Sequence, residues 1–207
     1  MRFVSLITGA ALLVLLVGLS AWSLTKGGSI LPDVQRVDVG QGALPPFGEE
    51  IAPVRIIFFG DLGSELSNRY LAEMLPKLER DYIATGNVVL YWRDFATLSA
   101  RSFEAAEAVR CIAEQGEVWP YLGVLSRDSA VDLSAAARAV GTSDEEFGSC
   151  RESDRYVSVV SEDAREGRGA GVQAVPTLFI NGRKVSGMVP YEILSGIIDE
   201  ELRRREE

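Results

Sequence analysis

The spacing of apolar residues changes several times along this chain, and each pattern predicts a different element. Residues 3–25 are 23 positions without a charge, which is long enough to cross a bilayer as a helix. Residues 54–59 are a short apolar run rich in β-branched and aromatic side chains, which predicts a buried strand. Residues 67–84 carry apolar side chains at helical spacing, and residues 88–92 predict a second strand. This order predicts a right-handed parallel βαβ unit.

The second half of the chain is predicted to be mostly helical until a short hairpin. Residues 99–169 consist of alanine-rich and charged segments at helical spacing, with breaks at glycines and serines. A proline then precedes a short apolar strand, and the Asn181-Gly182 pair predicts a tight turn into another strand. Residues 191–203 repeat apolar side chains on one helical face, so they predict a final amphipathic helix.

The N-terminal segment has the features of a membrane anchor. Its uncharged run is flanked by Arg2 and Lys26, and we favour an uncleaved transmembrane helix over residues 1–26 with the remaining chain exported. A cleaved signal peptide stays open, because Ala21-Trp22-Ser23 is an acceptable cleavage site. Residues 27–52 are rich in glycine and proline and predict a linker. The alternation from Val34 to Val39 leaves open an added edge strand that belongs to the core.

Composition excludes several classes of function. The formal net charge of −9 argues against nucleic acid as a partner, because phosphate binding needs clustered lysine and arginine. The chain has no histidine, which excludes a Ser–His–Asp hydrolase and a histidine-based zinc site. Its two cysteines, Cys111 and Cys150, are spaced for neither a Cys-x-x-C motif nor a zinc site. We therefore expect no metal and no cofactor.

Three segments carry a family resemblance by their order and spacing. Val175-Pro176-Thr177 leads into the predicted hairpin, Tyr91-Trp92-Arg93-Asp94-Phe95 closes the second strand, and residues 105–116 form a helix with Cys111 in its middle. Together they resemble the DsbA-like thiol–disulfide oxidoreductases, in their membrane-anchored bacterial form. The resemblance covers about Pro53 to Leu202.

This resemblance implies an α/β fold, thioredoxin-like with an α-helical insertion domain. Residues 53–98 and 170–207 would form the thioredoxin-like domain, and residues 99–169 the insertion. With the predicted anchor, it implies a domain on the extracytoplasmic side of a bacterial cell membrane, held there through residues 3–25. In that oxidising compartment disulfides persist.

The resemblance places a redox Cys-x-x-C at the start of the first helix, where this sequence has Ser64-Glu65-Leu66-Ser67. The two family cysteines correspond to Ser64 and Ser67. A helix N-terminus stabilises a thiolate, but a serine hydroxyl neither ionises there nor forms a disulfide. Helix capping by Ser64, with Glu65 complementing the helix dipole, accounts for the tetrapeptide. We predict a degenerate redox site, and we assign no catalytic role to the preceding Asp61.

The resemblance also implies roles for the proline loop and for the cysteines. In this family a cis bond precedes the loop proline, and the loop faces the redox motif and holds extended peptides. Val175, Pro176 and Thr177 are therefore candidate peptide-binding residues, although a purely structural turn stays open. Some relatives form a disulfide at the positions of Cys111 and Cys150, which implies a structural bridge. A redox-active or partner-linked pair stays open.

Two functional hypotheses follow. In the first, the chain has lost dithiol chemistry and binds or assembles extracytoplasmic proteins or peptides in the cell envelope. In the second, it is a thiol–disulfide oxidoreductase that uses Cys111 and Cys150, or a partner's thiol. The sequence supports the family more strongly than it supports enzymatic activity.

Overall fold

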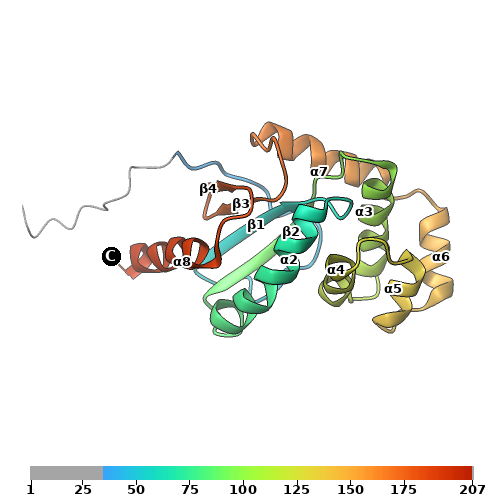
Figure 1. Ribbon diagram of the computed structural model, residues 1–207, viewed down its shortest axis with the longest axis horizontal. Helices are drawn as coiled ribbons and strands as arrows, with labels where there is room; N and C mark the ends of the chain where they lie inside the picture. Colours follow the sequence, from blue (N-terminus) through green and yellow to red (C-terminus); the bar gives the residue numbers. More distant parts are fainter. Residues whose placement is uncertain (1–34, 207) are drawn as a thin grey trace, which may run out of the picture. The chain divides into compact units, whose positions relative to one another are not determined.

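The computed structural model describes residues 35–206 (Figure 1). Along these residues the elements are β1 (Val54–Gly60), α2 (Glu65–Leu78), the π-helical turn η1 (Glu79–Ile83), β2 (Val88–Asp94), α3 (Ala100–Ala113), α4 (Val118–Arg127), α5 (Leu133–Ala139), α6 (Asp144–Glu152), α7 (Val157–Gly169), β3 (Thr177–Ile180), β4 (Arg183–Ser186) and α8 (Tyr191–Glu206). The predicted anchor over residues 1–26 lies outside this range. Within it, no helix combines the length and the apolar character needed to cross a bilayer.

The sheet has four strands in the order β2-β1-β3-β4. Strands β1 and β2 are parallel, in register from Val54 opposite Val88 to Gly60 opposite Asp94, which confirms the predicted βαβ unit. Strand β3 runs antiparallel to β1 and forms a hairpin with β4. The hairpin turn consists of Asn181 and Gly182, both with positive φ, as a tight turn of this kind requires.

Each face of the sheet has its own hydrophobic cluster, because side chains alternate along the strands. Ile56, Phe58 and Leu90 belong to the cluster that includes buried residues of α2 and α8. Phe59 and Phe179 belong to the other cluster, together with Ala164 of α7. From the sequence we predicted that α7 belongs to the helical insertion. In the structure α7 contacts β2 and covers the second face of the sheet.

The insertion itself is built from α3 to α6, which pack against one another, while α4 packs against α2 (Figure 1). Cys111 of α3 and Cys150 of α6 form a disulfide with a Cα–Cα distance of 5.7 Å, the bridge that the resemblance implied. Both cysteines are only 2% exposed. The bond therefore ties two helices of the insertion together inside its core.

Residues 35–52, here called the N-terminal arm, pack on the sheet, although we predicted a linker through residue 52. Arg36 forms a β-bridge with Arg183 of β4. At the opposite edge, Phe47 exchanges two backbone hydrogen bonds with Leu90 of β2, at 2.8 and 2.9 Å. Val39 is buried between these two points. The arm thus supplies partners for backbone groups at both edges of the sheet, and the alternation seen near Val39 was the sequence signal for it.

Candidate functional site

Residues 61–67, which comprise the loop after β1 and the first turn of α2, are called the mouth of α2. Ser64 is the N-cap of the helix, and its Oγ accepts a hydrogen bond from the backbone N–H of Ser67 at 3.3 Å. The Ser67 Oγ accepts one from the backbone N–H of Asp61 at 3.4 Å. Both serines are buried. The two hydroxyls at the redox positions therefore serve the local backbone, in the manner of helix capping.

Asp61 holds the mouth against the neighbouring loop. One carboxylate oxygen accepts a hydrogen bond from the N–H of Gly63 at 2.8 Å. The other accepts hydrogen bonds from the N–H groups of Thr97 and Leu98, at 3.2 and 3.3 Å. The residue is 1% exposed. Three N–H donors fix this carboxylate, so it ties the mouth to the loop that follows β2.

The proline loop lies at the same end of the sheet as the mouth. Thr177 pairs with Phe59, so the register sets Pro176 level with Gly60, the last residue of β1 before the mouth. The peptide bond between Val175 and Pro176 is cis. The loop is fixed by a hydrogen bond from the Thr177 Oγ1 to the carbonyl of Ala174, at 2.7 Å. The fold thus brings the three candidate loop residues to the strand end that precedes the serines.

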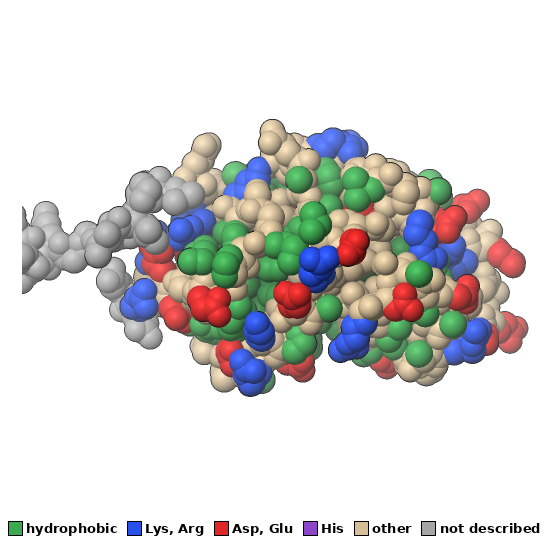
Figure 2. Space-filling view, viewed as in Figure 1, with side chains coloured by type: hydrophobic (Ala, Val, Ile, Leu, Met, Phe, Trp, Pro, Cys, Tyr) green, Lys and Arg blue, Asp and Glu red, His purple; other side chains and the backbone are tan. Residues whose placement is uncertain are grey.

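Apolar side chains are exposed around this end of the sheet. Leu66, between Ser64 and Ser67, is 52% exposed, and Leu98, whose backbone N–H donates to Asp61, is 61% exposed. The backbone N–H of Gly187 donates to the carbonyl of Pro176 at 2.8 Å, which places the next residue, Met188, near the proline loop. Figure 2 shows hydrophobic side chains gathered on this face between α2 and α8.

An apolar cleft of about 190 Å³ opens between α2 and the segment before α8. Its lining includes Tyr70 and Met74 from α2 and Met188 and Pro190 from the other side. The Tyr70 hydroxyl is buried without a hydrogen-bond partner, and burial raises the pKa of this residue to about 12. The cleft offers mainly apolar contact, of the type that takes hydrophobic side chains.

No thiol lies at the mouth, since the only two cysteines of the chain form the disulfide of the insertion. Among the described residues, no group of acidic, histidine or cysteine side chains is arranged to hold a metal ion. The chemistry that the mouth offers is therefore hydrogen bonding and apolar contact. It has no thiol for exchange with a disulfide.

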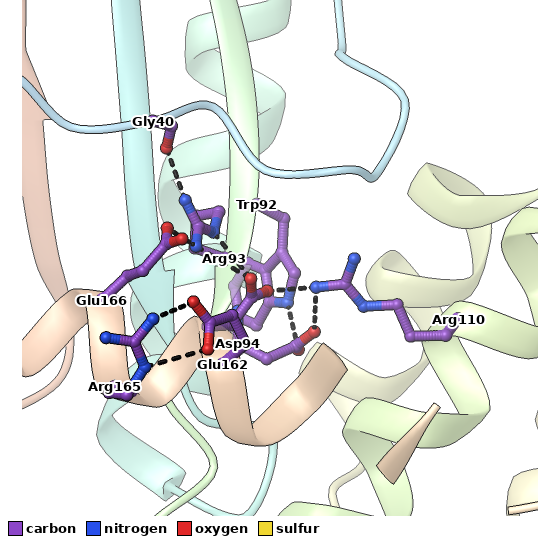
Figure 3. Close-up of polar contacts among 9 residues, drawn as sticks. Gly40, Trp92, Arg93, Asp94, Arg110, Glu162, Arg165 and Glu166 are labelled. Atoms are coloured by element: carbon purple, nitrogen blue, oxygen red, sulfur yellow. Dashed lines mark hydrogen bonds and ion pairs between the residues drawn. The ribbon is translucent and has the colours of Figure 1, made fainter. Parts of the chain in front are cut away.

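A buried cluster of charges lies beside the mouth, and sequence analysis did not predict it (Figure 3). We call the group of Arg93, Asp94, Arg110 and Asp163 the charge joint, because it connects β2, α3 and α7. Arg93 donates to one Asp163 oxygen from Nε at 3.1 Å and from Nη2 at 2.8 Å. Arg110 donates to Asp94 at 3.0 Å and also to Asp163.

All four members of the charge joint are buried, so their charges depend on one another. Burial raises the pKa of Asp94 to about 6, and the attraction of Arg110 offsets only part of that effect. Asp94 also accepts a hydrogen bond from Trp92 Nε1 at 2.7 Å. The Arg93-Asp94 pair closing a strand was visible in the sequence, but the partners on α3 and α7 could not be assigned from local spacing.

The comparisons with known proteins place this geometry among thioredoxin-fold proteins. The family model described as Thioredoxin matches residues 42–200. The chain is 25% identical over 170 residues to the probable disulfide bond formation protein D of Bacillus cereus, which covers 76% of this chain and 78% of that protein. The fold of the present chain is similar to that of oxidised BdbD from Bacillus subtilis. The TM-score is 0.75 and the identity 20%, over 83% of this chain and 100% of that one.

A second solved structure gives the same result. The α-DsbA1 of Wolbachia pipientis superposes with a TM-score of 0.70 and 20% identity, over 79% of this chain and 94% of that one. At this identity the structures establish the fold, an α/β thioredoxin-like sheet with a helical insertion.

Proposed function

Because this chain belongs to the thioredoxin family, in its DsbA-like branch, we propose that it is a binding or assembly module of the bacterial cell envelope without dithiol activity at the mouth. The observation that carries this proposal is the use of Ser64 and Ser67 as backbone-capping groups where dithiol exchange needs two sulfur atoms. In this proposal the domain is extracytoplasmic and is held by an anchor over residues 3–25.

The binding surface that we propose consists of the mouth, the proline loop and the apolar cleft. Pro176 lies level with the end of β1, while Leu66 and Leu98 expose apolar area beside it. A loop at a strand end can pair with an extended peptide through its backbone, and nearby apolar pockets then select side chains. Val175 and Thr177 flank the proline and would contact such a peptide directly.

Binding of an extended peptide tests this proposal. The probe is the alkylated insulin B chain, which has no free thiol, and the measurement is calorimetric titration of the full-length chain. We expect Pro176→Ala to weaken binding about tenfold, because the loop loses the shape that presents its backbone. The matched control is Pro120→Ala, since Pro120 is an exposed proline of α4. Equal binding by wild type and Pro176→Ala would contradict the proposed surface.

The competing hypothesis is an oxidoreductase that works through Cys111 and Cys150. Both cysteines are 2% exposed, so a substrate thiolate has little access to the disulfide. Reduction of insulin by dithiothreitol separates the two hypotheses. Activity above the blank that disappears in Cys111→Ala would favour the oxidoreductase. We expect no activity in wild type and a gain in Ser64→Cys with Ser67→Cys, because the helix N-terminus still stabilises a thiolate.

A further inference from the structure

The lining of the apolar cleft combines two thioethers with two aromatic rings. Met74 of α2 and Met188 of the segment before α8 supply the sulfur atoms, while Tyr70 and Tyr191 supply the rings. Met74 is 2% exposed and Met188 is 37% exposed, so one sulfur belongs to the core and the other is accessible from the surface. Thioethers and aromatic rings both attract an aromatic ring beyond the gain from burial alone. The lining therefore distinguishes an aromatic side chain from an aliphatic one.

The volume and the charges of the apolar cleft suit one uncharged ring. The cleft measures about 190 Å³, and an apolar protein cavity of about 150 Å³ takes one benzene molecule. Its lining includes one acidic and one basic side chain, Glu73 and Lys77, and both are exposed. The opposite charges balance, so an uncharged side chain is the complementary occupant.

Tyr191, the first residue of α8, is held in place from both sides of the apolar cleft. Its hydroxyl donates to the carboxylate of Asp81 in η1 at 2.8 Å and lies 3.1 Å from the carbonyl oxygen of Lys77 in α2. The Lys77 ammonium lies 5.3 Å from the centre of the Tyr191 ring. These contacts fix the ring before a ligand arrives, which lowers the entropy cost of binding against it.

We propose that the apolar cleft selects an aromatic side chain of the bound peptide and that Tyr191 determines this preference. The inference rests on the proposed function, because it names the residue type that the peptide-binding surface recognises. Met188 directly follows Gly187, whose N–H donates to the Pro176 carbonyl at 2.8 Å. An extended peptide paired with the proline loop would place a nearby side chain at this cleft. Phenylalanine has the single apolar ring that the volume takes.

The test follows methionine methyl signals by NMR in the full-length chain, labelled at its methionine methyl groups. Of the three methionines, Met74 and Met188 line the apolar cleft and report directly on binding. The probe is N-acetyl-phenylalanine amide. N-acetyl-leucine amide is the aliphatic probe, because burial of the two side chains yields similar free energies. We expect the phenylalanine probe to shift both signals and to bind at least about fivefold more tightly than the leucine probe.

Variants of Tyr191 separate the ring from its tether. Tyr191→Phe keeps the ring but loses the hydroxyl, and we expect about threefold weaker binding of the phenylalanine probe. The matched control is Tyr82→Phe, which should leave that affinity unchanged. The Tyr82 hydroxyl also joins η1 to α8, through Asp199 at 2.8 Å, but Tyr82 is not among the residues that line the cleft.

The ratio of the affinities for the phenylalanine and leucine probes tests the preference itself. Tyr191→Leu removes the ring and should lower this ratio at least about twofold. Met188→Leu removes a sulfur at an exposed position and should lower the ratio about twofold as well. This second variant keeps the test valid if Tyr191→Leu does not fold.

Any of four results would overturn the inference: no shift of the cleft signals by the phenylalanine probe, equal or tighter binding of the leucine probe, equal affinities in Tyr191→Phe and Tyr82→Phe, or an affinity ratio that neither leucine variant changes. The insulin B chain separates this inference from the proposed function. Binding of the phenylalanine probe without binding of the B chain supports the aromatic preference of the cleft and contradicts only the proposed peptide-binding surface.

Discussion

The mouth of α2 and the charge joint lie at the ends of neighbouring strands, since Gly60 of β1 pairs with Asp94 of β2. Different interactions stabilise these two regions. The two serines of the mouth use hydrogen bonds between residues close in sequence, such as Ser64 and Ser67. The charge joint uses buried ions on three elements, with 70 positions separating Arg93 from Asp163. Because of this difference, a single change at the mouth alters local hydrogen bonds, whereas a single change in the charge joint takes a partner away from a buried ion.

The largest expected effect comes from Asp163→Ala. It removes the carboxylate shared by Arg93 and Arg110 and leaves each buried cation with a single carboxylate partner. We expect the free energy of unfolding to fall by about 3–5 kcal/mol, the cost of breaking a buried pair. Urea unfolding measures it. The control is Glu162→Ala, whose partner Arg165 is exposed (Figure 3), and it should change stability by less than about 1 kcal/mol. Equal losses of unfolding free energy in the two variants would refute the distinction between buried and exposed ion pairs.

The next effect concerns the disulfide of the insertion. Replacing both Cys111 and Cys150 by serine opens a loop with a sequence separation of 39. Chain entropy predicts a loss of about 2–4 kcal/mol in the free energy of unfolding, while the mouth should be unaffected. Urea unfolding of the oxidised wild type and of the double variant gives the difference. Adding dithiothreitol should lower the stability of wild type only. Identical curves would show that the bridge does not stabilise the fold.

The pH dependence of stability tests the charge joint itself. The pKa of Asp94 is raised to about 6 in the folded protein, so the folded state binds its proton more tightly than the unfolded state does. Stability from this group is therefore greatest at low pH and is lost as the pH rises through about 6. In Asp94→Asn the side chain at this position is uncharged at every pH. Its stability relative to wild type should rise by up to about 3 kcal/mol between pH 4 and pH 8. A stability difference between Asp94→Asn and wild type that does not change with pH would contradict the raised pKa of Asp94.

The smallest effect is expected at the mouth. Ser64→Ala removes the side-chain acceptor at the N-cap of α2 and should cost about 1 kcal/mol of unfolding free energy. Ser64→Asp restores an acceptor and should recover that loss. Thermal unfolding is sensitive enough for both measurements. If Ser64→Ala lost as much unfolding free energy as Asp163→Ala, the stability of the fold would depend on the mouth as strongly as on the charge joint.

The parts of the fold that could be predicted from sequence are those with local signals. The βαβ unit and the hairpin follow from apolar spacing and from the Asn181-Gly182 turn, and the structure confirms both. The cap at Ser64 follows from its position before a helical pattern. The charge joint and the packing of the N-terminal arm depend on partners far away along the chain. Nothing in the sequence near Asn68, a buried residue of α2, signals that its amide oxygen has no hydrogen-bond partner.

The N-terminal arm has a consequence for proteolysis of the chain. Proteolysis upstream of Arg36 would leave both bridges in place, at Arg183 and at Leu90. Proteolysis near Ala52 would strip them away, together with the burial of Val39 and Leu44. The trimmed fragment would then expose unpaired strand edges beside the apolar surface that Val39 and Leu44 had covered, and such edges promote self-association. The position of the cut would thus decide whether the edges of the sheet stay covered or become prone to aggregation.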